Sequence, residues 1–289
     1  MKNTSIAIIG ASGFIGSSLF NFLNKQNSLS QIFGTYYLNK KNNKLTKLDA
    51  YSENNLKSFM IDKLPAFIIF ASGLKNVDIC EKKPRLALLN NVLPIILLTK
   101  LITRLKLNTK LLFISSDYVF SGNRGKYREN DLRNPTTFYG YTKKLAEEIL
   151  ENSQVDFKIL RTSSVVGKKS KFVQWFLTQT KINSFSLYSN VYSSPTPIQL
   201  LNEGIFYLIQ NYENISGDRL HLCGNYRMSR YKLGLKLLEV FKKKVKIRPD
   251  KVVNFNKILT PKDLSMMPSL FMNKVQKFTW EKYLALSLS

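Results

Sequence analysis

Two short stretches of the chain carry side chains that can move a proton. The apolar run 111–114 ends in Ser115 and Ser116, and further on Tyr139 is followed four residues later by Lys143. Residues four apart lie on one face of a helix. A phenol, with an ordinary pKa of about 10, is a poor acid near neutral pH unless a nearby ammonium stabilises its phenolate. A serine hydroxyl can hold a substrate oxygen against that phenol. Ser116, Tyr139 and Lys143 therefore predict proton transfer to a carbonyl that is being reduced.

The elements around these residues have the pattern of a parallel α/β sheet. Strands alternating with helices imply a parallel sheet with both faces covered, and such sheets bind ligands at the carboxyl ends of their strands. Gly10, Ser72 and Ser116 all fall at such ends. The expected strands are 6–9, 31–36, 45–49, 66–73, 111–114 and 157–163, and the expected helices of this half are 17–23, 52–60, 84–105 and the run around Lys143.

The remainder of the chain is less regular and predicts a smaller lobe. Helices are expected at 198–212, after the break at Pro195 and Pro197, and at 235–241. We expect residues 1–163 to form the dinucleotide-binding domain with the catalytic residues. Residues 164–289 would mainly form the substrate-binding lobe, with some segments returning to the first domain.

A glycine-rich turn follows the first strand. Gly10, Gly13 and Gly16 stand between the run 6–9 and the helical pattern 17–23. This spacing permits a tight turn, close approach of the backbone to a pyrophosphate and close helix–strand packing. The N-terminus of the helix supplies free N–H donors and a favourable dipole for phosphates. The turn predicts a dinucleotide site.

The end of the second strand indicates which dinucleotide. A site that prefers NAD carries an acid there for the ribose hydroxyls, whereas this chain has Thr35 and Tyr36, followed by Asn39, Lys40 and Lys41. Cations at this place suit a 2′-phosphate, although an exposed loop would explain the lysines nearly as well. NADP(H) is therefore the favoured cofactor, and NAD(H) stays open.

Composition narrows the function classes. The 289 residues carry a formal net charge of +25, but the lysines are spread along the whole chain, which disfavours a nucleic-acid site.

Cys80 and Cys223 give neither zinc spacing nor a disulfide framework. No continuous apolar run reaches the roughly 18 residues of a membrane span. Residues 1–4 lead straight into the first expected strand, so we expect no cleavable signal. We expect a cytoplasmic protein without membrane insertion.

Taken together, these residues resemble an extended short-chain dehydrogenase/reductase, and more narrowly the dTDP-4-dehydrorhamnose reductase family. The similarity covers nearly the whole chain. Its parts are the glycine turn, the run 115–120, Asn134-Pro135 before Tyr139-Gly140 and Lys143, Val77-Asp78 with Glu81, Asn91-Val92, the run 160–163, Pro195-Thr196, and the run 261–265.

The resemblance implies a Rossmann fold and a role for each matched residue. Tyr139 would give the proton, Lys143 would lower the pKa of Tyr139 and hold the nicotinamide ribose, and Ser116 would hold the carbonyl oxygen of a nucleotide-linked 4-keto-6-deoxysugar. Substrate contacts are expected from Ser116, Asp117, Tyr118, Ser164 and Pro195. Cofactor contacts are expected from Gly10, Ser12, Gly13, Phe14, Ile15, Gly16, Tyr36, Lys40, Asp49, Ala50, Ala71, Ser72, Gly73, Asn91, Ser115, Tyr139 and Lys143.

The chain departs from the family pattern near the expected substrate. Family members usually have Thr at the position of Ser116 and Trp at the position of Ser164, and a Gln and a Gly where this chain has Val191 and Ser193. Loss of a large aromatic side chain and an amide changes pocket shape and hydrogen bonding. The redox chemistry survives these changes, whereas the identity of the sugar stays open.

Three functions remain in consideration. The first is an NADPH-dependent reductase of a nucleotide-diphospho-4-keto-6-deoxysugar in surface polysaccharide synthesis. Such a reductase would bind no nucleic acid and could form a homodimer. The second is an epimerase or dehydratase of the same fold, to which Asp117 lends limited support. The third is a non-catalytic regulatory subunit, as one relative of the family serves a methionine adenosyltransferase.

Some residues invite structural interpretations. The only histidine, His221, is expected in a strand with a structural role. Trp175 and Trp280 are expected to pack the lobe. Some family members are linked to a magnesium-dependent dimer, but the acidic cluster for that is not evident in the carboxylate-poor second half, and we expect no metal.

Overall fold

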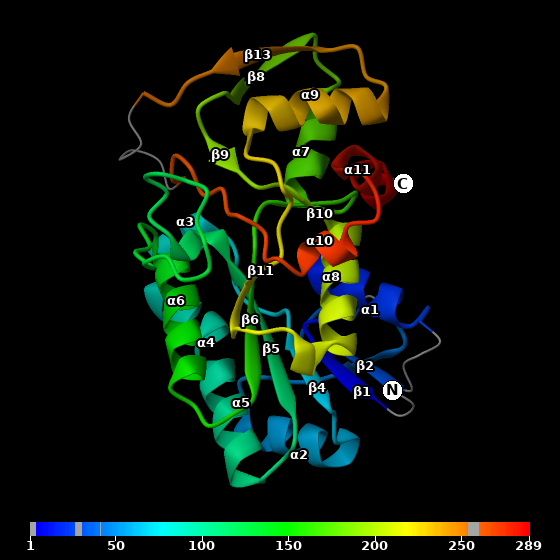
Figure 1. The fold of residues 1–289 in the computed structure, drawn as a ribbon, viewed down its shortest axis with the longest axis vertical. Coiled ribbons are helices and arrows are strands. Elements are labelled where there is room, and N and C mark those ends of the chain that lie inside the picture. Colours follow the sequence, from blue (N-terminus) through cyan, green and yellow to red (C-terminus); the bar gives the residue numbers. More distant parts are fainter. Residues whose placement is uncertain (1–3, 27–30, 41, 254–259) are drawn as a thin grey trace. The chain divides into compact units, whose positions relative to one another are not determined.

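The computed structural model describes residues 4–26, 31–40, 42–253 and 260–289, and the chain divides into two compact units (Figure 1). Unit 1 comprises Met1–Val119, Thr137–Leu160 and Ser216–Arg219, and unit 2 comprises Phe120–Thr136, Arg161–Ile215 and Leu220–Ser289. Residues 120–136 precede the domain boundary expected at 163 but cluster with unit 2. One reason is that this segment hydrogen-bonds with the late part of the chain, where Asp263 N donates to Gly122 O over 2.9 Å and Tyr127 N donates to Ser265 O over 2.9 Å.

A seven-stranded sheet has the order β11-β6-β5-β4-β1-β2-β3, with parallel pairing of β1 with β2 and β4, of β4 with β5, and of β2 with β3. This agrees with the fold class predicted from the alternation of strands and helices. The strands are β1 (Ser5–Ile9), β2 (Gln31–Tyr36), β3 (Leu45–Lys47), β4 (Phe67–Phe70), β5 (Lys110–Ser116), β6 (Phe157–Thr162) and β11 (Arg219–His221).

The strands of unit 1 pack against helices through one apolar core. Alternate residues of β1, β4 and β5, such as Ile9, Phe70 and Phe113, share this core with side chains of α2, α5 and α6. Phe113 and the other members are almost wholly removed from water, which supplies the main free energy of folding. The helices are α1 (Phe14–Leu23), α2 (Glu53–Lys63), α3 (Val77–Lys82), α4 (Pro84–Asn91), α5 (Leu93–Arg104) and α6 (Phe138–Glu151), and η1 (Asp117–Val119) is a 3₁₀ turn.

The prediction of a single helix over 84–105 was wrong, because the chain forms two helices, α4 and α5, with Val92 between them. Pro94 lies in the first turn of α5, where its missing N–H is tolerated at the start of a helix but not inside one. The whole segment Pro84–Arg104 is nevertheless long and apolar enough to meet the criteria for a membrane span, a feature that continuous apolar runs alone did not indicate. In its most apolar window 56% of the residues are buried, and core helices also meet these criteria.

Unit 2 combines short strand pairs with longer helices around its own core. Trp280 is fully buried in this core, and its Nε1 donates to Pro195 O over 2.8 Å. Trp175, which was also expected to pack the lobe, is 43% exposed, and its ring contacts Phe172 and Phe185 of the same unit. The elements are β7 (Val165–Val166), α7 (Lys171–Gln179), β8 (Ser184–Tyr188), β9 (Tyr192–Ser193), β10 (Thr196–Pro197), α8 (Ile198–Gln210), η2 (Tyr212–Asn214), β12 (Met228–Ser229), α9 (Arg230–Phe241), β13 (Lys246–Asp250), α10 (Met272–Val275) and α11 (Trp280–Leu288).

Candidate active site

The glycine turn between β1 and α1 is built by close backbone contacts. Gly10 has φ +91°, a conformation that L side chains rarely adopt, and a Cβ on Gly10 would lie 2.8 Å from Ser72 N. A Cβ on Gly16 would overlap Gly10 O. Gly13 is the N-cap of α1, and among the described residues no side chain caps this helix end and no acid stands in its first turn. The first N–H groups of α1 therefore suit an anion.

A pocket of about 200 Å³ opens beside this turn. Five residues predicted to contact the cofactor line it: Gly10, Ser12, Tyr36, Ala50 and Ser72. The other lining residues were not among the predicted cofactor contacts, although Thr35 and Asn39 were noted at the end of the second strand; they are Ile9, Thr35, Tyr37, Leu38, Asn39, Leu48 and Tyr51.

Two of the unpredicted residues give the pocket an aromatic wall. The rings of Tyr37 and Tyr51 meet edge to face with centroids 5.3 Å apart, and the Tyr51 hydroxyl donates to Asn90 Oδ1 over 2.7 Å. An aromatic wall next to a turn whose N–H groups suit an anion fits the adenosine end of a dinucleotide. The position of both tyrosines just after β2 and β3 is the sequence signal that could have found them.

The remaining residues predicted around this pocket have varied positions. Asp49 Oδ1 accepts from Tyr51 N over 2.9 Å, so this carboxylate shapes the turn that presents Tyr51. Lys40 is exposed next to Asn39, and Lys41 lies outside the described residues. Phe14 and Ile15 are partly exposed in the first turn of α1, and the Lys75 ammonium lies 5.7 Å from the centre of the Phe14 ring.

The start of α6 is fixed by two side chains, which sets the position of Tyr139 in its first turn. Thr137 Oγ1 accepts from Gly140 N over 3.1 Å, and Glu81 Oε1 of α3 accepts from Phe138 N over 2.6 Å. A helix begins with four N–H groups that lack partners inside the helix, and these contacts satisfy two of them. Glu81, which the sequence placed in a family motif without a role, thus caps the helix that carries Tyr139.

Tyr139 is half-buried between polar and aromatic neighbours. Its ring meets the Tyr118 ring edge to face with centroids 5.5 Å apart, and its side chain hydrogen-bonds with Ser116. Burial raises the pKa of Tyr139 above its ordinary value, a direction in which Asp117, Tyr118 and Cys80 also act, whereas the Ser116 hydrogen bond lowers it. The phenol is therefore protonated at neutral pH.

Lys143 is buried one turn along α6, where its ammonium donates to Ile114 O over 3.0 Å and lies 4.5 Å from the centre of the Phe113 ring. Burial lowers the pKa of Lys143 to about 8, although Glu147 and Cys80 act in the opposite direction. The pKa of Tyr139 is raised overall, and burial of the phenol is the largest cause. That Lys143 lowers the pKa of Tyr139 stays a prediction.

Asn91, predicted to lie along the cofactor, is a fully buried connector. Its Oδ1 accepts from Leu74 N over 2.7 Å, and its Nδ2 donates to Leu74 O over 3.1 Å and to Thr142 Oγ1 over 2.9 Å. Thr142 Oγ1 in turn donates to Tyr139 O over 2.8 Å. Asn91 therefore ties the loop after β4, which contains Ala71, Ser72 and Gly73, to the turn of α6 that carries Tyr139.

The predicted substrate residues fall in both units. In unit 1, Ser116 Oγ donates to Asp117 Oδ1 over 2.9 Å, and both side chains are buried. In unit 2, Ser164 is exposed with φ +35°, and Pro195 O receives the Trp280 hydrogen bond. Substrate contacts by Ser164 and Pro195 stay a prediction.

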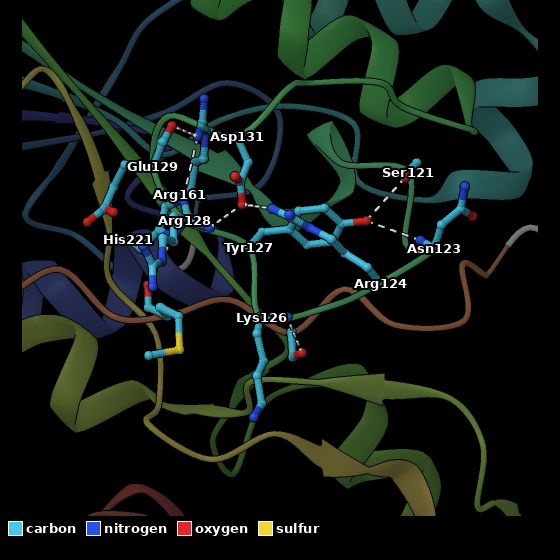
Figure 2. A network of polar contacts seen from close by, with 12 residues as sticks. Ser121, Asn123, Arg124, Lys126, Tyr127, Arg128, Glu129, Asp131, Arg161 and His221 are labelled. Atoms are coloured by element: carbon cyan, nitrogen blue, oxygen red, sulfur yellow. Dashed lines mark hydrogen bonds and ion pairs between the residues drawn. The ribbon is translucent and has the colours of Figure 1, made fainter.

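His221 belongs to a buried polar network of unit 2 (Figure 2). Its Nδ1 lies 3.0 Å from Met267 O and its Nε2 lies 3.4 Å from Arg161 Nη1. Because a carbonyl oxygen only accepts and a guanidinium only donates, we assign the proton to Nδ1. The Arg161 guanidinium also donates to Glu129 O over 2.9 Å. This agrees with the structural role predicted for His221.

The described residues contain no group of three or more His, Cys, Asp or Glu side chains that could hold a metal ion.

The chain is similar to known proteins along nearly its whole length. The model of the RmlD substrate binding domain family matches residues 4–286. The chain belongs to this family. This match and the similarity to a dTDP-4-dehydrorhamnose reductase confirm the predicted family. The structural similarity to a solved dTDP-4-dehydrorhamnose reductase confirms the predicted fold class.

Three similar proteins illustrate the range of its relatives. The chain is 26% identical over 243 residues to methionine adenosyltransferase 2 subunit beta of Xenopus laevis, covering 81% of this chain and 71% of that protein. It is 29% identical over 178 residues to a dTDP-4-dehydrorhamnose reductase of Aggregatibacter actinomycetemcomitans, covering 61% of this chain and 57% of that one. The solved structure of the Bacillus anthracis dTDP-4-dehydrorhamnose reductase in complex with NADP has a TM-score of 0.83 at 23% identity, covering 98% of each chain.

Proposed function

We propose that this protein is an NADPH-dependent reductase of a nucleotide-diphospho-4-keto-6-deoxysugar, similar in reaction to dTDP-4-dehydrorhamnose reductase. The observation that carries the proposal is the placement of Tyr139 beside Ser116 at the end of β5, with the Lys143 ammonium one helical turn away and donating to Ile114 O of the same strand. The relative from Aggregatibacter and the family match support the same reaction.

The residues of this chain have defined tasks in that reaction. The bound nicotinamide would supply a hydride to the sugar ketone. The Ser116 hydroxyl, which donates to Asp117 Oδ1 in the structure, would turn to donate to the carbonyl oxygen, and the Tyr139 phenol would give its proton to that oxygen. Because the pKa of Tyr139 is raised, the proton to be donated is present at neutral pH. Because the pKa of Lys143 is about 8, its ammonium form predominates at pH 7 and stabilises the phenolate left behind.

The pocket beside the glycine turn supports a dinucleotide, with the pyrophosphate at the N-terminus of α1 and the adenosine against Tyr37 and Tyr51. The segment from Tyr36 to Asn39 lines the pocket and contains no acidic residue. Lys40 follows it directly in the sequence. We therefore infer a preference for NADPH, with NADH as a weaker alternative. Titration of the protein's fluorescence with each cofactor tests this, and tighter binding of NADH would contradict it.

The decisive experiment follows NADPH oxidation with a panel of nucleotide 4-keto-6-deoxysugars generated in situ by their dehydratases. Turnover with one member establishes the reductase and identifies its substrate. Conversion of a nucleotide sugar without net NADPH oxidation would instead indicate an epimerase or dehydratase of the same fold.

A second function is favoured by one specific observation, the similarity to methionine adenosyltransferase 2 subunit beta across 81% of this chain. In that case the protein would bind the cofactor and regulate a partner enzyme. Binding of NADPH without turnover of any sugar, together with stable co-purification of a methionine adenosyltransferase, would support this alternative. The retained Ser116, Tyr139 and Lys143 favour the reductase.

We also propose that the protein acts in the cytoplasm, where nucleotide sugars are made. Its partner would be the small-molecule substrate rather than nucleic acid or membrane, and a homodimer is compatible with these properties. Sedimentation at several protein concentrations measures the oligomeric state.

A further inference from the structure

One buried carboxylate behind the active site has no part in the chemistry described so far. Glu147 lies on α6, one turn beyond Lys143, and none of its surface is exposed. Its Oε1 accepts a hydrogen bond of 2.5 Å from Ser115 Oγ, which is also buried. Burying a carboxylate is costly unless charges or hydrogen bonds compensate for it. Its placement next to Lys143 therefore calls for a physical explanation.

Glu147 and Lys143 together join α6 to β5 at adjacent strand residues. The Lys143 ammonium donates to Ile114 O over 3.0 Å, and the next residue, Ser115, donates to Glu147. Two contacts of this kind fix both the distance and the rotation of the helix relative to the strand end. That strand end carries Ser116, and that helix carries Tyr139. The pair of contacts thus sets the geometry of the two groups that would hold the substrate carbonyl.

The charge of Glu147 acts on Lys143 as well. Burial disfavours the ammonium, and Glu147 is the foremost of the groups that favour it, followed by Cys80 of α3. Two titratable side chains of η1 are also near, Asp117 and Tyr118, and both raise the pKa of Tyr139. Without the carboxylate, the groups left near the ammonium to oppose desolvation are Cys80, the Ile114 carbonyl and the face of the Phe113 ring.

We infer that Glu147 is a positioning residue of the proposed reductase, whose carboxylate keeps the Lys143 side chain charged and holds the strand end that carries Ser116 against α6. This inference rests on the proposed function.

The kinetic test compares two matched substitutions on the same helix. Glu147→Gln keeps the shape of the side chain and an oxygen that accepts from Ser115 but removes the charge. Glu148→Gln, at the next position, is the control, because the Glu148 side chain is 39% exposed and pairs only at 3.6 Å with Lys144. We expect the alkaline limb of the kcat profile to move down by about one pH unit in Glu147→Gln, so that kcat at pH 9 falls about tenfold. The profile of Glu148→Gln should match the unmodified protein.

A direct titration provides a readout that needs no substrate. In protein labelled with ¹³C at lysine Cε, the Lys143 resonance is assigned by its loss in Lys143→Arg, and its shift is followed with pH. The midpoint should be lower in Glu147→Gln by the same amount as the kinetic limb. An unchanged midpoint in a folded Glu147→Gln protein would overturn the inference. Failure of every sugar to turn over would refute the reductase alone, since the titration still decides the role of Glu147.

Two further variants separate charge from geometry. Glu147→Asp keeps the charge but shortens the reach to Ser115, and Ser115→Ala removes the donor. Both should lower kcat several-fold while the alkaline limb stays in place. If Glu147→Gln does not accumulate as folded protein, these two variants carry the test. An alkaline limb that moves in Glu147→Asp, or an unchanged kcat in both variants, would then contradict the proposed role.

Discussion

Unit 1 and unit 2 each contain a cluster of buried polar groups, but the two clusters differ in whether their members can still change their protonation state. In unit 2 the Arg161 guanidinium is fully buried between the Phe120 ring, Glu129 O and His221, so that it holds strands and loops together. In unit 1, Tyr139 is half-buried, and its neighbour Lys143 has a pKa lowered to about 8.

The difference shows how buried polarity divides into structural and chemical uses. A buried group with a full set of partners stabilises one arrangement and has little freedom to change its charge. A group with a shifted pKa near a pocket remains able to accept or release a proton, which is the property that functional sites require. Disrupting each cluster should therefore affect a different measurable property, and four predictions test this.

The largest expected effect is on turnover, from Tyr139→Phe. Loss of the general acid should lower kcat by about 10²- to 10⁴-fold, while NADPH affinity and thermal stability stay nearly unchanged. The measurement is steady-state kinetics with the identified sugar, alongside a fluorescence titration with NADPH. Activity within a few-fold of the unmodified protein would show that Tyr139 is not the proton donor.

The matching prediction for unit 2 concerns stability. Arg161→Leu removes one member of the buried network and leaves the Glu129 carbonyl and His221 Nε2 without that donor. We expect the free energy of unfolding to fall by about 3–5 kcal/mol, measured by urea denaturation. Lys143→Met is the comparison in unit 1 and should abolish turnover with a much smaller loss of stability. Equal losses of stability in the two variants would remove the distinction between the clusters.

The pH dependence of turnover should report the ammonium of Lys143. The folded-state pKa of this group is lowered to about 8, so the charged form is present below that pH and lost above it. We therefore expect kcat to be nearly constant from pH 6 to 7 and to fall about tenfold for each unit well above pH 8. A kcat that stays constant up to pH 10 would contradict the role proposed for Lys143.

The smallest effect is expected at the start of α6. Thr137→Ala removes the cap that accepts from Gly140 N and should lower the free energy of unfolding by about 1 kcal/mol. Because Tyr139 lies in this first turn, kcat should also fall modestly. Thr178→Ala is the control, since its hydroxyl is exposed and bonds within α7. A stability loss in the control as large as in Thr137→Ala would argue against the cap.

Much of the fold could be predicted because its signals are local. The runs of β1 and β2, the spacing of Gly10, Gly13 and Gly16, and the four-residue interval from Tyr139 to Lys143 can all be recognised in short windows of the sequence. Helix and strand periodicities are properties of neighbouring residues, and they suffice to predict that Gly10, Ser72 and Ser116 lie at the same edge of the sheet. The break between α4 and α5 also had a local signal, Pro94. The continuous apolar pattern of this segment nevertheless led to the prediction of one uninterrupted helix.

The sequence by itself thus determined the αβ alternation, the glycine turn and the identity of the three candidate catalytic residues. Only the tertiary structure decided which distant groups surround them. Ser115 and Glu147 are 32 positions apart, and Arg161 and His221 are 60 apart. Tyr37 and Tyr51 likewise meet only through the folding of β2 and β3. These contacts depend on how strands and helices pack, and no short window contains both partners. The pKa of Tyr139 follows the same rule, because burial, a property of the whole fold, decides its direction.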